Sequence, residues 1–92
     1  MFVENLDENF NISVQEVQNL KQKPTDQELL KLYGLYKQSL FGNNNTNQPS
    51  FFDFKSKSKW NSWNDQVGKG KTRAKREYIE LVTFLKNKYG VN

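Results

Sequence analysis

The 92-residue sequence contains no cysteine and no histidine. These absences exclude disulfide bonds, thiolate or imidazole metal ligands, and the Ser-His or Cys-His pairs of nucleophilic enzymes. The ten aspartate and glutamate residues form no recognisable acid/base or metal motif, and ordinary surface solvation accounts for them. We therefore predict a protein that is not an enzyme, with no catalytic residues, no metal site and no cofactor.

The sequence also lacks a long hydrophobic run, since no segment approaches the roughly 18 apolar residues of a membrane-spanning helix. The N-terminal stretch MFVENLDENF carries acidic residues where a secretion signal needs a basic start followed by an apolar stretch. The absence of cysteine fits a reducing compartment. These observations favour a cytoplasmic protein.

Charge is distributed unevenly along the chain, whose formal net charge is +4 at pH 7. Residues 1–28 hold six acidic and two basic side chains, whereas residues 29–92 hold four acidic and twelve basic ones. Residues 55–76 alone carry eight lysines or arginines against one aspartate. Such a cluster favours an anionic partner, namely a phosphate ester, nucleic acid or an anionic membrane, and an ordinary solvated surface is the alternative.

Apolar side chains recur every three or four residues in two early segments, which predicts amphipathic helices over about residues 8–20 and 25–41. Pro24 ends the first helix, and Thr25 with Glu28 three residues later forms a capping-box pattern that starts the second. The positions that define the first helix are Phe10, Val14, Val17 and Leu20, and those of the second are Leu29, Leu32, Tyr33, Tyr36 and Leu40.

Residues 43–50, NNNTNQPS, have no periodicity and are predicted to form a loop, which is long for a connection between antiparallel helices. Two further helices are predicted over about residues 55–67, with Trp60, Trp63 and Val67 on one face, and over 71–89, ending at Gly90. No useful length of chain alternates with period two. We therefore predict one all-α domain spanning residues 1–92, a four-helix bundle with one long connection.

The last two helices are both expected to begin among lysines and arginines, although the N-terminus of a helix favours negative groups. A bound phosphate would compensate for this arrangement, and side chains extending into water are the alternative. On the second helix, Tyr33, Tyr36 and Lys37 share one face. Two phenols and an ammonium group can stack on a base and hold a phosphate, although tyrosines at helical spacing more often belong to a core.

Four blocks of the chain, LKQKPTDQELLKLYGLYKQ, GNNNTNQPS, DFKSKSKWNSWND and YIELVTFLKNKYG, together resemble the acyl-CoA-binding protein family. The agreement is colinear from about Phe10 to Gly90. The resemblance implies a four-helix bundle in up-down-down-up order, with a long loop joining the second and third helices. The loop would let these two helices run in the same direction, placing lysines of the third beside the tyrosines of the second.

The resemblance also implies that the protein binds one long-chain fatty acyl-CoA thioester without catalysis, as an intracellular carrier and pool former. By matching motif, Tyr33 and Lys37 would hold the 3′-phosphate region, and Lys59 would be the third phosphate contact. Tyr36 would lie beside the adenine and the acyl chain, and Tyr78 would close the site from the fourth helix.

The remaining residues that the resemblance assigns to the ligand are Leu29, Leu30, Lys23 and Val14. The two leucines would offer apolar surface to the acyl chain, and Lys23 would lie near the phosphates at the entrance. Val14 stands where many members have alanine, and Gln18 where many have lysine. The fourth helix starts with Gly70 to Arg73 instead of serine and acidic residues, so we expect a poorer cap unless Thr72 supplies it.

We expect a monomer that meets anionic membrane surfaces and acyl-CoA-using enzymes and does not bind nucleic acid. One alternative is a small helical nucleic-acid-binding domain, which would need a coherent basic face on one helix, whereas the lysines here are divided between two helix starts. A protein-interaction domain or regulatory peptide precursor is a further alternative, and it would need exposed apolar anchors.

Overall fold

The computed structural model describes residues 5–92, which form four α-helices and one short 3₁₀ helix, and the predicted all-α class is confirmed. Residues 1–4 lie outside the described residues. The predicted domain begins with them, and so does the N-terminal stretch that we expect not to be a secretion signal. Within the described range, β pairing is limited to one isolated bridge between Leu20 and Val91. No helix there is both long enough and apolar enough to cross a membrane.

The first helix, α1, spans Leu6–Glu16 and therefore begins two residues before the expected start. Asn5 caps it, because its side-chain oxygen accepts a hydrogen bond from the backbone N–H of Glu8 at 3.0 Å. The expected α-helical stretch to residue 20 is wrong at its end, since the 3₁₀ helix η1 covers Val17–Asn19. Leu20 is extended because it pairs with Val91.

The second helix, α2, spans Asp26–Phe41 and is preceded by the predicted capping box. The Thr25 hydroxyl accepts from the backbone N–H of Glu28 at 3.2 Å, and the Glu28 carboxylate accepts from the backbone N–H of Thr25 at 2.8 Å. Gly42 ends the helix with φ 77°, a left-handed value that glycine adopts without strain.

The third helix, α3, spans Phe54–Asn64, so the expected range of 55–67 is wrong at its C-terminal end. Asp53 caps the start by accepting from the backbone N–H of Ser56. The chain turns after Asn64, with tight backbone bonds from Gln66 to Trp63 and from Val67 to Asn64. The turn holds Gly68 at φ 87°, and Val67 is exposed instead of facing the core.

The fourth helix, α4, spans Lys71–Tyr89. Its N-cap is Gly70, which supplies no side-chain hydrogen bond, and Thr72 lies inside the first turn. The expected alternative, a cap supplied by Thr72, is therefore wrong. At the other end, Gly90 terminates the helix with φ 78°.

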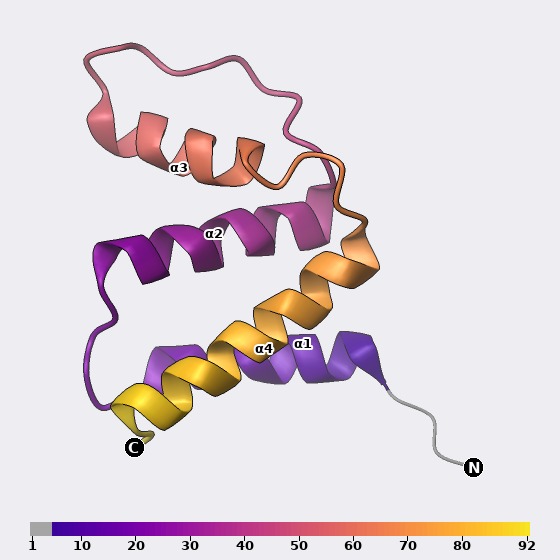
Figure 1. Cartoon of the computed structure of the whole chain (residues 1–92), viewed down its shortest axis with the longest axis vertical. Helices are drawn as coiled ribbons and strands as arrows, with labels where there is room; N and C mark the ends of the chain where they lie inside the picture. Colours follow the sequence, from indigo (N-terminus) through magenta and orange to yellow (C-terminus); the bar gives the residue numbers. More distant parts are fainter. Residues whose placement is uncertain (1–4) are drawn as a thin grey trace.

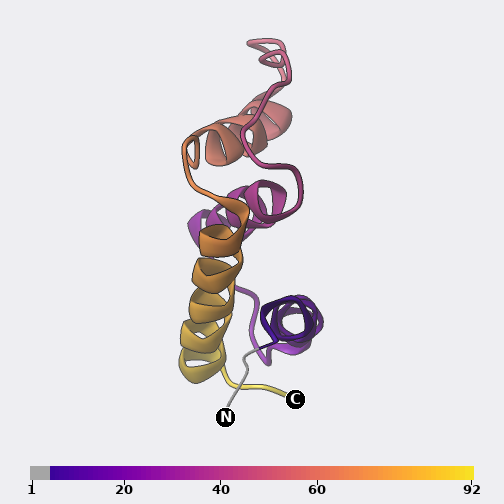
Figure 2. The same cartoon turned by 90° about the vertical axis from the view of Figure 1, so that its right-hand side faces the viewer.

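The helices pack in the spatial order α1, α4, α2, α3, since α4 contacts both α1 and α2, and α2 contacts α3. In Figure 1, α2 and α3 lie side by side and run in the same direction, whereas α1 and α4 run in the opposite direction. Figure 2 shows the α2–α3 pair stacked on one end of α4, with α1 beside its other end. This is the up-down-down-up order that the resemblance implied, and the two parallel helices are joined by residues 42–53.

The connection over residues 42–53 is anchored by both tryptophans of α3. The indole N–H of Trp63 donates to the carbonyl of Gly42 at 2.8 Å, and that of Trp60 donates to the carbonyl of Thr46 at 3.1 Å. The Asn44 side chain donates to the Trp60 carbonyl. The loop therefore has a fixed path over α3 although its sequence has no helical or strand pattern.

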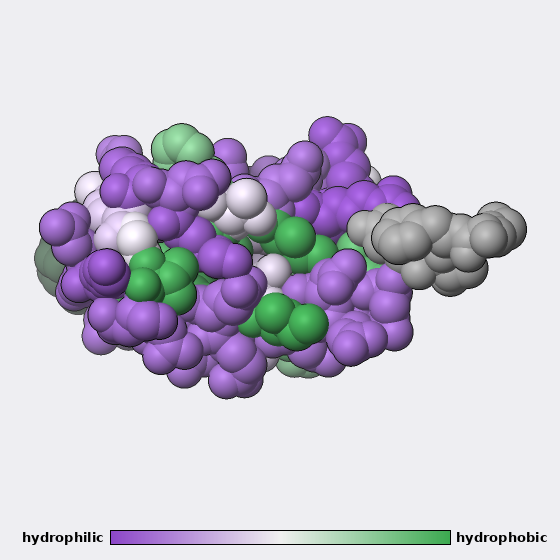
Figure 3. Space-filling view, turned by 90° about the horizontal axis from the view of Figure 1, so that it is seen from below, coloured by the Kyte–Doolittle hydropathy of each residue, from purple (hydrophilic) through white to green (hydrophobic). Residues whose placement is uncertain are grey.

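The core lies where α1, α2 and α4 meet, and its buried members are Phe10, Leu32, Leu35, Tyr78, Val82 and Leu85. Seen from below, the end of the molecule formed by α1 and α4 has a mainly hydrophilic surface with several separate hydrophobic areas (Figure 3). The core therefore sits on one side of α2, and the opposite side of α2 is left to face α3.

Candidate functional site

Three of the predicted site residues meet between α2 and α3, at the ring of Tyr33. The Lys37 ammonium nitrogen lies 5.9 Å from the centre of this ring, and the Lys59 nitrogen lies 5.5 Å from it. Lys37 comes from the same helix, one turn further on, whereas Lys59 comes from α3. The parallel packing of α2 and α3 therefore places two cations around one aromatic ring.

The Lys37 ammonium group is also close to two rings that the sequence analysis did not include in the site. It lies 4.7 Å from the centre of the Phe41 ring and 5.2 Å from that of Trp63. Rings at such distances attract a cation without neutralising its charge. Phe41 follows Lys37 by four residues on α2, so helical spacing was a signal that could have placed it here.

Gly34 lets α2 and α3 approach closely enough to form this arrangement. A Cβ atom built at Gly34 would collide with the carbonyl oxygen of Ser62 and would lie 2.7 Å from its carbonyl carbon. Sequence reasoning missed this residue, although an isolated glycine inside a helical pattern is a recognised signal of close packing. The close contact fixes the separation between Tyr33 and the lysines of α3.

A groove of about 310 Å³ opens beside these residues, between the start of α2 and the start of α3. Both predicted leucines, Leu29 and Leu30, line it together with Lys59. The other lining residues, which sequence reasoning did not assign to the site, are Asp26, Lys55 and Ser58. Spacing of three and four residues from Lys55 places it, Ser58 and Lys59 on one face of α3.

A second cavity, of about 360 Å³, also touches Leu30 but is lined mainly by polar side chains, namely Gln27, Lys31, Ser62, Asp65 and Gln66. Although it is the larger of the two, it is lined by one leucine and one lysine, whereas the groove is lined by two of each. The groove at Leu29 is the better match to a ligand that combines hydrocarbon with phosphate.

Tyr36 and Tyr78 belong to a cluster of three rings at the edge of the core. Tyr36 stacks on Phe10 with ring centres 6.0 Å apart, and Phe10 meets Tyr78 edge-on at 5.1 Å. Tyr36 remains half-buried, whereas Tyr78 is only 4% exposed. Burial, with a smaller contribution from Tyr36, raises the pKa of Tyr78 to about 12, so its phenol is neutral at physiological pH. Tyr78 thus supports Tyr36 from the core side.

The structure does not bring Lys23 or Val14 to the groove. Lys23 is exposed in the connection before α2, and within residues 5–92 it lines neither cavity. Val14 is half-buried and packs against the core from α1. The role predicted for each in ligand binding remains a prediction.

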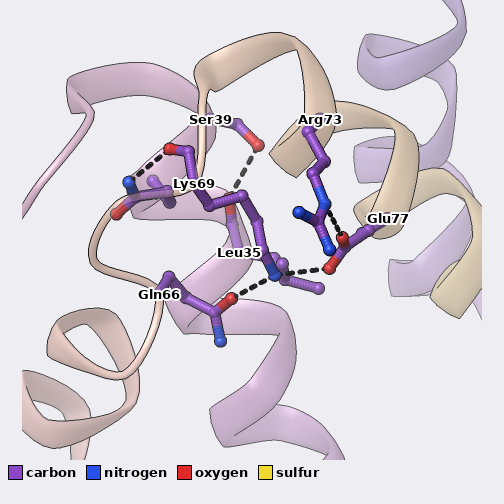
Figure 4. A network of polar contacts seen from close by, with 7 residues as sticks. Leu35, Ser39, Gln66, Lys69, Arg73 and Glu77 are labelled. Carbon is purple, nitrogen blue, oxygen red and sulfur yellow. Dashed lines mark hydrogen bonds and ion pairs between the residues drawn. The ribbon is translucent and has the colours of Figure 1, made fainter.

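Several basic side chains at the start of α4 are paired with carboxylates, and the close-up in Figure 4 shows Lys69 and Arg73 with Glu77. The Lys69 ammonium group donates to Glu77 and to Gln66, and Arg73 donates to the other oxygen of Glu77 at 2.8 Å. The bond from Lys69, and after it that from Arg73, lowers the pKa of the Glu77 carboxyl. Lys75 pairs with Asp7 of α1. The positive charge at the start of α4 is therefore partly compensated within the protein, by Glu77 and Asp7.

The start of α3 differs, since none of Lys55, Lys57 and Lys59 forms an ion pair within the part of the chain that the structure describes. Lys37, on the facing side of α2, likewise has rings and no carboxylate around it in residues 5–92. The uncompensated positive charge of the site is therefore provided by α3 and by Lys37.

Comparison with known proteins gives a consistent result. The family model described as "Acyl CoA binding protein" matches residues 7–82. The Drosophila melanogaster "Acyl-CoA-binding protein homolog" is 44% identical over 82 residues, covering 89% of this chain and 95% of that protein. The Caenorhabditis elegans "Acyl-CoA-binding protein homolog 1" is 43% identical over 81 residues, covering 88% and 94% respectively.

Solved structures agree with this similarity. The crystal structure of Oryza sativa Acyl-CoA-Binding Protein 2 is similar with a TM-score of 0.88 and 33% identity, and the match covers 91% of this chain and 93% of that chain. The crystal structure of ACBP from Moniliophthora perniciosa is similar with a TM-score of 0.85 and 30% identity, and the match covers 94% of this chain and 85% of that chain.

Proposed function

Because the chain belongs to the acyl-CoA-binding protein family, we propose that it binds long-chain fatty acyl-CoA thioesters and serves as their carrier and pool former. The structural observation that carries this proposal is the meeting of Tyr33, Lys37 and Lys59 beside a groove that contains Leu29 and Leu30. A cationic, ring-lined site next to apolar surface matches a ligand with a phosphorylated head and a hydrocarbon tail.

The head of the ligand is assigned to the lysines around Tyr33. Lys37 and Lys59 approach this ring from two helices, and the phosphates of coenzyme A would supply the negative charge that their surroundings lack. Each lysine–phosphate contact contributes about 1–3 kcal/mol, since the groups are partly solvated and screened by salt. Phe41, beside Lys37, would offer a ring face for the adenine, and Tyr36 would offer another at the edge of the core.

The tail is assigned to the groove between the starts of α2 and α3. Burying one methylene group contributes about 0.8 kcal/mol, so a palmitoyl chain contributes on the order of 10 kcal/mol if it is wholly sheltered. Part of this energy is lost to the cost of association. The tail therefore provides most of the affinity, and the head provides the selectivity against free fatty acid.

The binding needs no bond-making step, and we propose that the protein is a carrier and not an enzyme. It would hold a detergent-like thioester away from water in the cytoplasm, as a monomer and without a cofactor. It would exchange the ligand with acyl-CoA-using enzymes and with anionic membrane surfaces. Lys23 would assist the phosphates from the entrance, and Val14 and Tyr78 would shape the site from the core side.

Isothermal titration calorimetry with three ligands tests this function. We expect tight binding of palmitoyl-CoA, far weaker binding of free coenzyme A, and negligible binding of palmitate. Because tail and head act together, neither part alone reproduces the affinity of the whole molecule. Equal affinities for free coenzyme A and palmitoyl-CoA would refute the proposal.

A further inference from the structure

Three exposed phenylalanines precede the lysines of α3, and we call Phe51, Phe52 and Phe54 the aromatic patch. Their side chains are 67%, 82% and 71% exposed. The rings of Phe51 and Phe52 have centres 5.4 Å apart, and those of Phe51 and Phe54 are 6.5 Å apart. The three rings therefore form one contiguous apolar surface that is not part of the core.

The backbone presents this patch through a turn that is unusual in composition. The Asp53 N–H donates to the Ser50 carbonyl at 3.0 Å, which places Phe51 and Phe52 at the two central positions of a four-residue turn. Such positions are normally filled by glycine, proline, asparagine, aspartate or serine. Local chemistry that contradicts the usual preference is expected at functional places. The turn therefore holds two large apolar rings in water, and packing against the core does not explain their position.

Positive charge surrounds the aromatic patch. The Lys57 ammonium group lies 5.2 Å from the centre of the Phe51 ring, and Lys55 follows Phe54 directly on α3. The carboxylate of residues 50–59 is that of Asp53, which caps α3 by accepting from Ser56. Rings with lysines around them are the composition that settles at the boundary between lipid headgroups and acyl chains. Each lysine there gains further attraction from anionic headgroups.

The position of the aromatic patch suits a flat surface better than a second protein. Residues 50–54 lie at the end of the molecule opposite α1 and the C-terminal end of α4 (Figures 1 and 2). Three rings of this exposure offer on the order of 400 Å² of apolar area. A stable protein interface needs about 800 Å² from each partner, whereas an interfacial anchor works with a few inserted rings.

We propose that the aromatic patch, together with Lys55 and Lys57, is a docking surface for anionic lipid bilayers. Lys55 also lines the groove between α2 and α3, along with Ser58 and Lys59 of the same helix. Docking therefore brings the mouth of the groove to the bilayer. If the protein carries acyl-CoA, as proposed above, docking lets an acyl chain pass between the bilayer and the groove without crossing open water.

Co-sedimentation of the ligand-free protein with vesicles tests docking separately from acyl-CoA binding. The vesicles consist of phosphatidylcholine alone or of phosphatidylcholine with phosphatidylserine. We expect binding to the anionic vesicles and little to the neutral ones. The variant Phe51→Ala/Phe52→Ala should reduce the partition coefficient at least about tenfold, since each ring loses its burial in the interface. Lys57→Gln should reduce it about fivefold.

Matched controls distinguish the patch from general effects of charge and hydrophobicity. Phe84→Ala removes another exposed phenylalanine, from α4, and Lys21→Gln removes another exposed lysine, from the connection before α2. Both should bind anionic vesicles as the unmodified protein does. All variants should keep their circular dichroism spectra, because the altered side chains lie outside the core.

The outcomes separate docking from the proposed function. Phe51→Ala/Phe52→Ala should bind palmitoyl-CoA in solution with unchanged affinity and take it up more slowly from anionic vesicles. Wild-type protein that stays in solution with anionic vesicles, or a double variant that partitions like wild type, overturns the inference. So does a wild-type dimer that the double variant abolishes in the absence of vesicle binding, which would identify the patch as a contact between copies.

Discussion

At the scale of single residues, the ring of Tyr33 is the centre of the candidate site. Lys37 and Lys59 lie on it from two helices, and the Lys37 ammonium group is further surrounded by Phe41 and Trp63. Aromatic faces hold an ammonium group in place while leaving its charge available to a further anion. The site is therefore arranged for an anionic ligand before any ligand arrives.

Replacing either lysine by methionine should weaken palmitoyl-CoA binding while preserving the fold. We expect Lys37→Met and Lys59→Met each to raise Kd about tenfold to hundredfold, because a charged hydrogen bond to phosphate is lost. Isothermal titration calorimetry measures the change. Lys31→Met is the matched control, since it removes an exposed lysine of α2 that lies outside the groove.

The 3′-phosphate provides a sharper version of the same test. Palmitoyl-3′-dephospho-CoA should bind wild type more weakly than the parent compound does. If Lys37 and Lys59 hold that phosphate, the double variant should no longer distinguish the two ligands. A double variant that still prefers the phosphorylated ligand by the wild-type factor would contradict the assignment.

Glu28 should make the stability of the fold depend on acid pH. The hydrogen bond from Lys88, followed by those from Tyr89 and Thr25, lowers the pKa of Glu28 from 4.5 to about 2. A carboxyl group whose pKa is lower in the folded state stabilises the fold above its unfolded pKa. This contribution is lost as the pH falls from about 4.5 to about 2.

Urea denaturation at several acid pH values measures the effect. The unfolding midpoint of wild type should fall over this interval, and Glu28→Gln should have a lower midpoint at neutral pH and a flatter dependence on acid pH. Glu80→Gln, the same change at an exposed position of α4, should keep the wild-type profile. Parallel profiles for wild type and Glu28→Gln would show that this carboxylate does not contribute.

At the scale of helices, the position of α3 on α2 depends on the absence of a side chain at Gly34. Gly34→Ala forces its methyl group against the Ser62 backbone, so α2 and α3 must move apart. We expect a loss of about 1–3 kcal/mol in the free energy of unfolding, as for other overpacked contacts. Weaker palmitoyl-CoA binding should accompany it, because Tyr33 and Lys59 are separated. Urea denaturation and calorimetry measure the two effects.

Gly70→Ser is the matched control for this prediction. A Cβ atom at Gly70 meets nothing within 4 Å, and serine at this N-cap can accept a hydrogen bond that glycine cannot. The change should leave ligand binding unaltered and stabilise the fold by a few tenths of a kcal/mol, about the difference between these caps. Gly34→Ala protein with wild-type stability and affinity would show that the close contact is not required.

Local sequence signals predicted these helices where the deciding contacts are themselves local. The capping box at Thr25 and Glu28 joins residues three apart, and periodicity depends on neighbours within a turn or two. The signals failed where distant contacts decide. α3 ends early in a turn whose Gly68 N–H donates to Asn43, and α1 gives way to η1 before the bridge from Leu20 to Val91.

The site, like the helices, was predictable from sequence where its residues are close together in the chain. Tyr33 and Lys37 share a helix face, so spacing alone relates them. Lys59 reaches the same ring only because α3 runs parallel to α2, and the family resemblance supplied that topology. Lys55 and Ser58 were missed because their role depends on which side of α3 faces the groove. The meeting of Phe41 with Trp63 across two helices is a tertiary contact that no spacing reveals.

At the scale of the whole molecule, the acidic N-terminal part partly neutralises the basic C-terminal part. Among residues 5–92, three ion pairs join them, from Asp7 to Lys75, from Glu16 to Lys86 and from Glu28 to Lys88. Within residues 5–92, Lys37 and the three lysines of α3 form no ion pair, so they provide a local positive surface at the site. A duplex needs a coherent basic face, whereas a single phosphorylated head needs only a local one. This distribution favours the small ligand over nucleic acid.

This division between head and tail predicts that salt and acyl length act independently on affinity. Along the series octanoyl-, dodecanoyl- and palmitoyl-CoA, Kd should fall about fourfold per methylene, from about 0.8 kcal/mol each, until the groove is filled. Added NaCl should raise Kd by the same factor for every member, because salt screens the contacts of lysines with the phosphates and does not act on the burial of the tail. Calorimetric titrations across both variables measure this. A salt dependence that grows with acyl length would show that lysines also contact the tail end of the ligand. An affinity that does not change with acyl length would contradict the lipid assignment and favour a protein that binds nucleic acid or nucleotides.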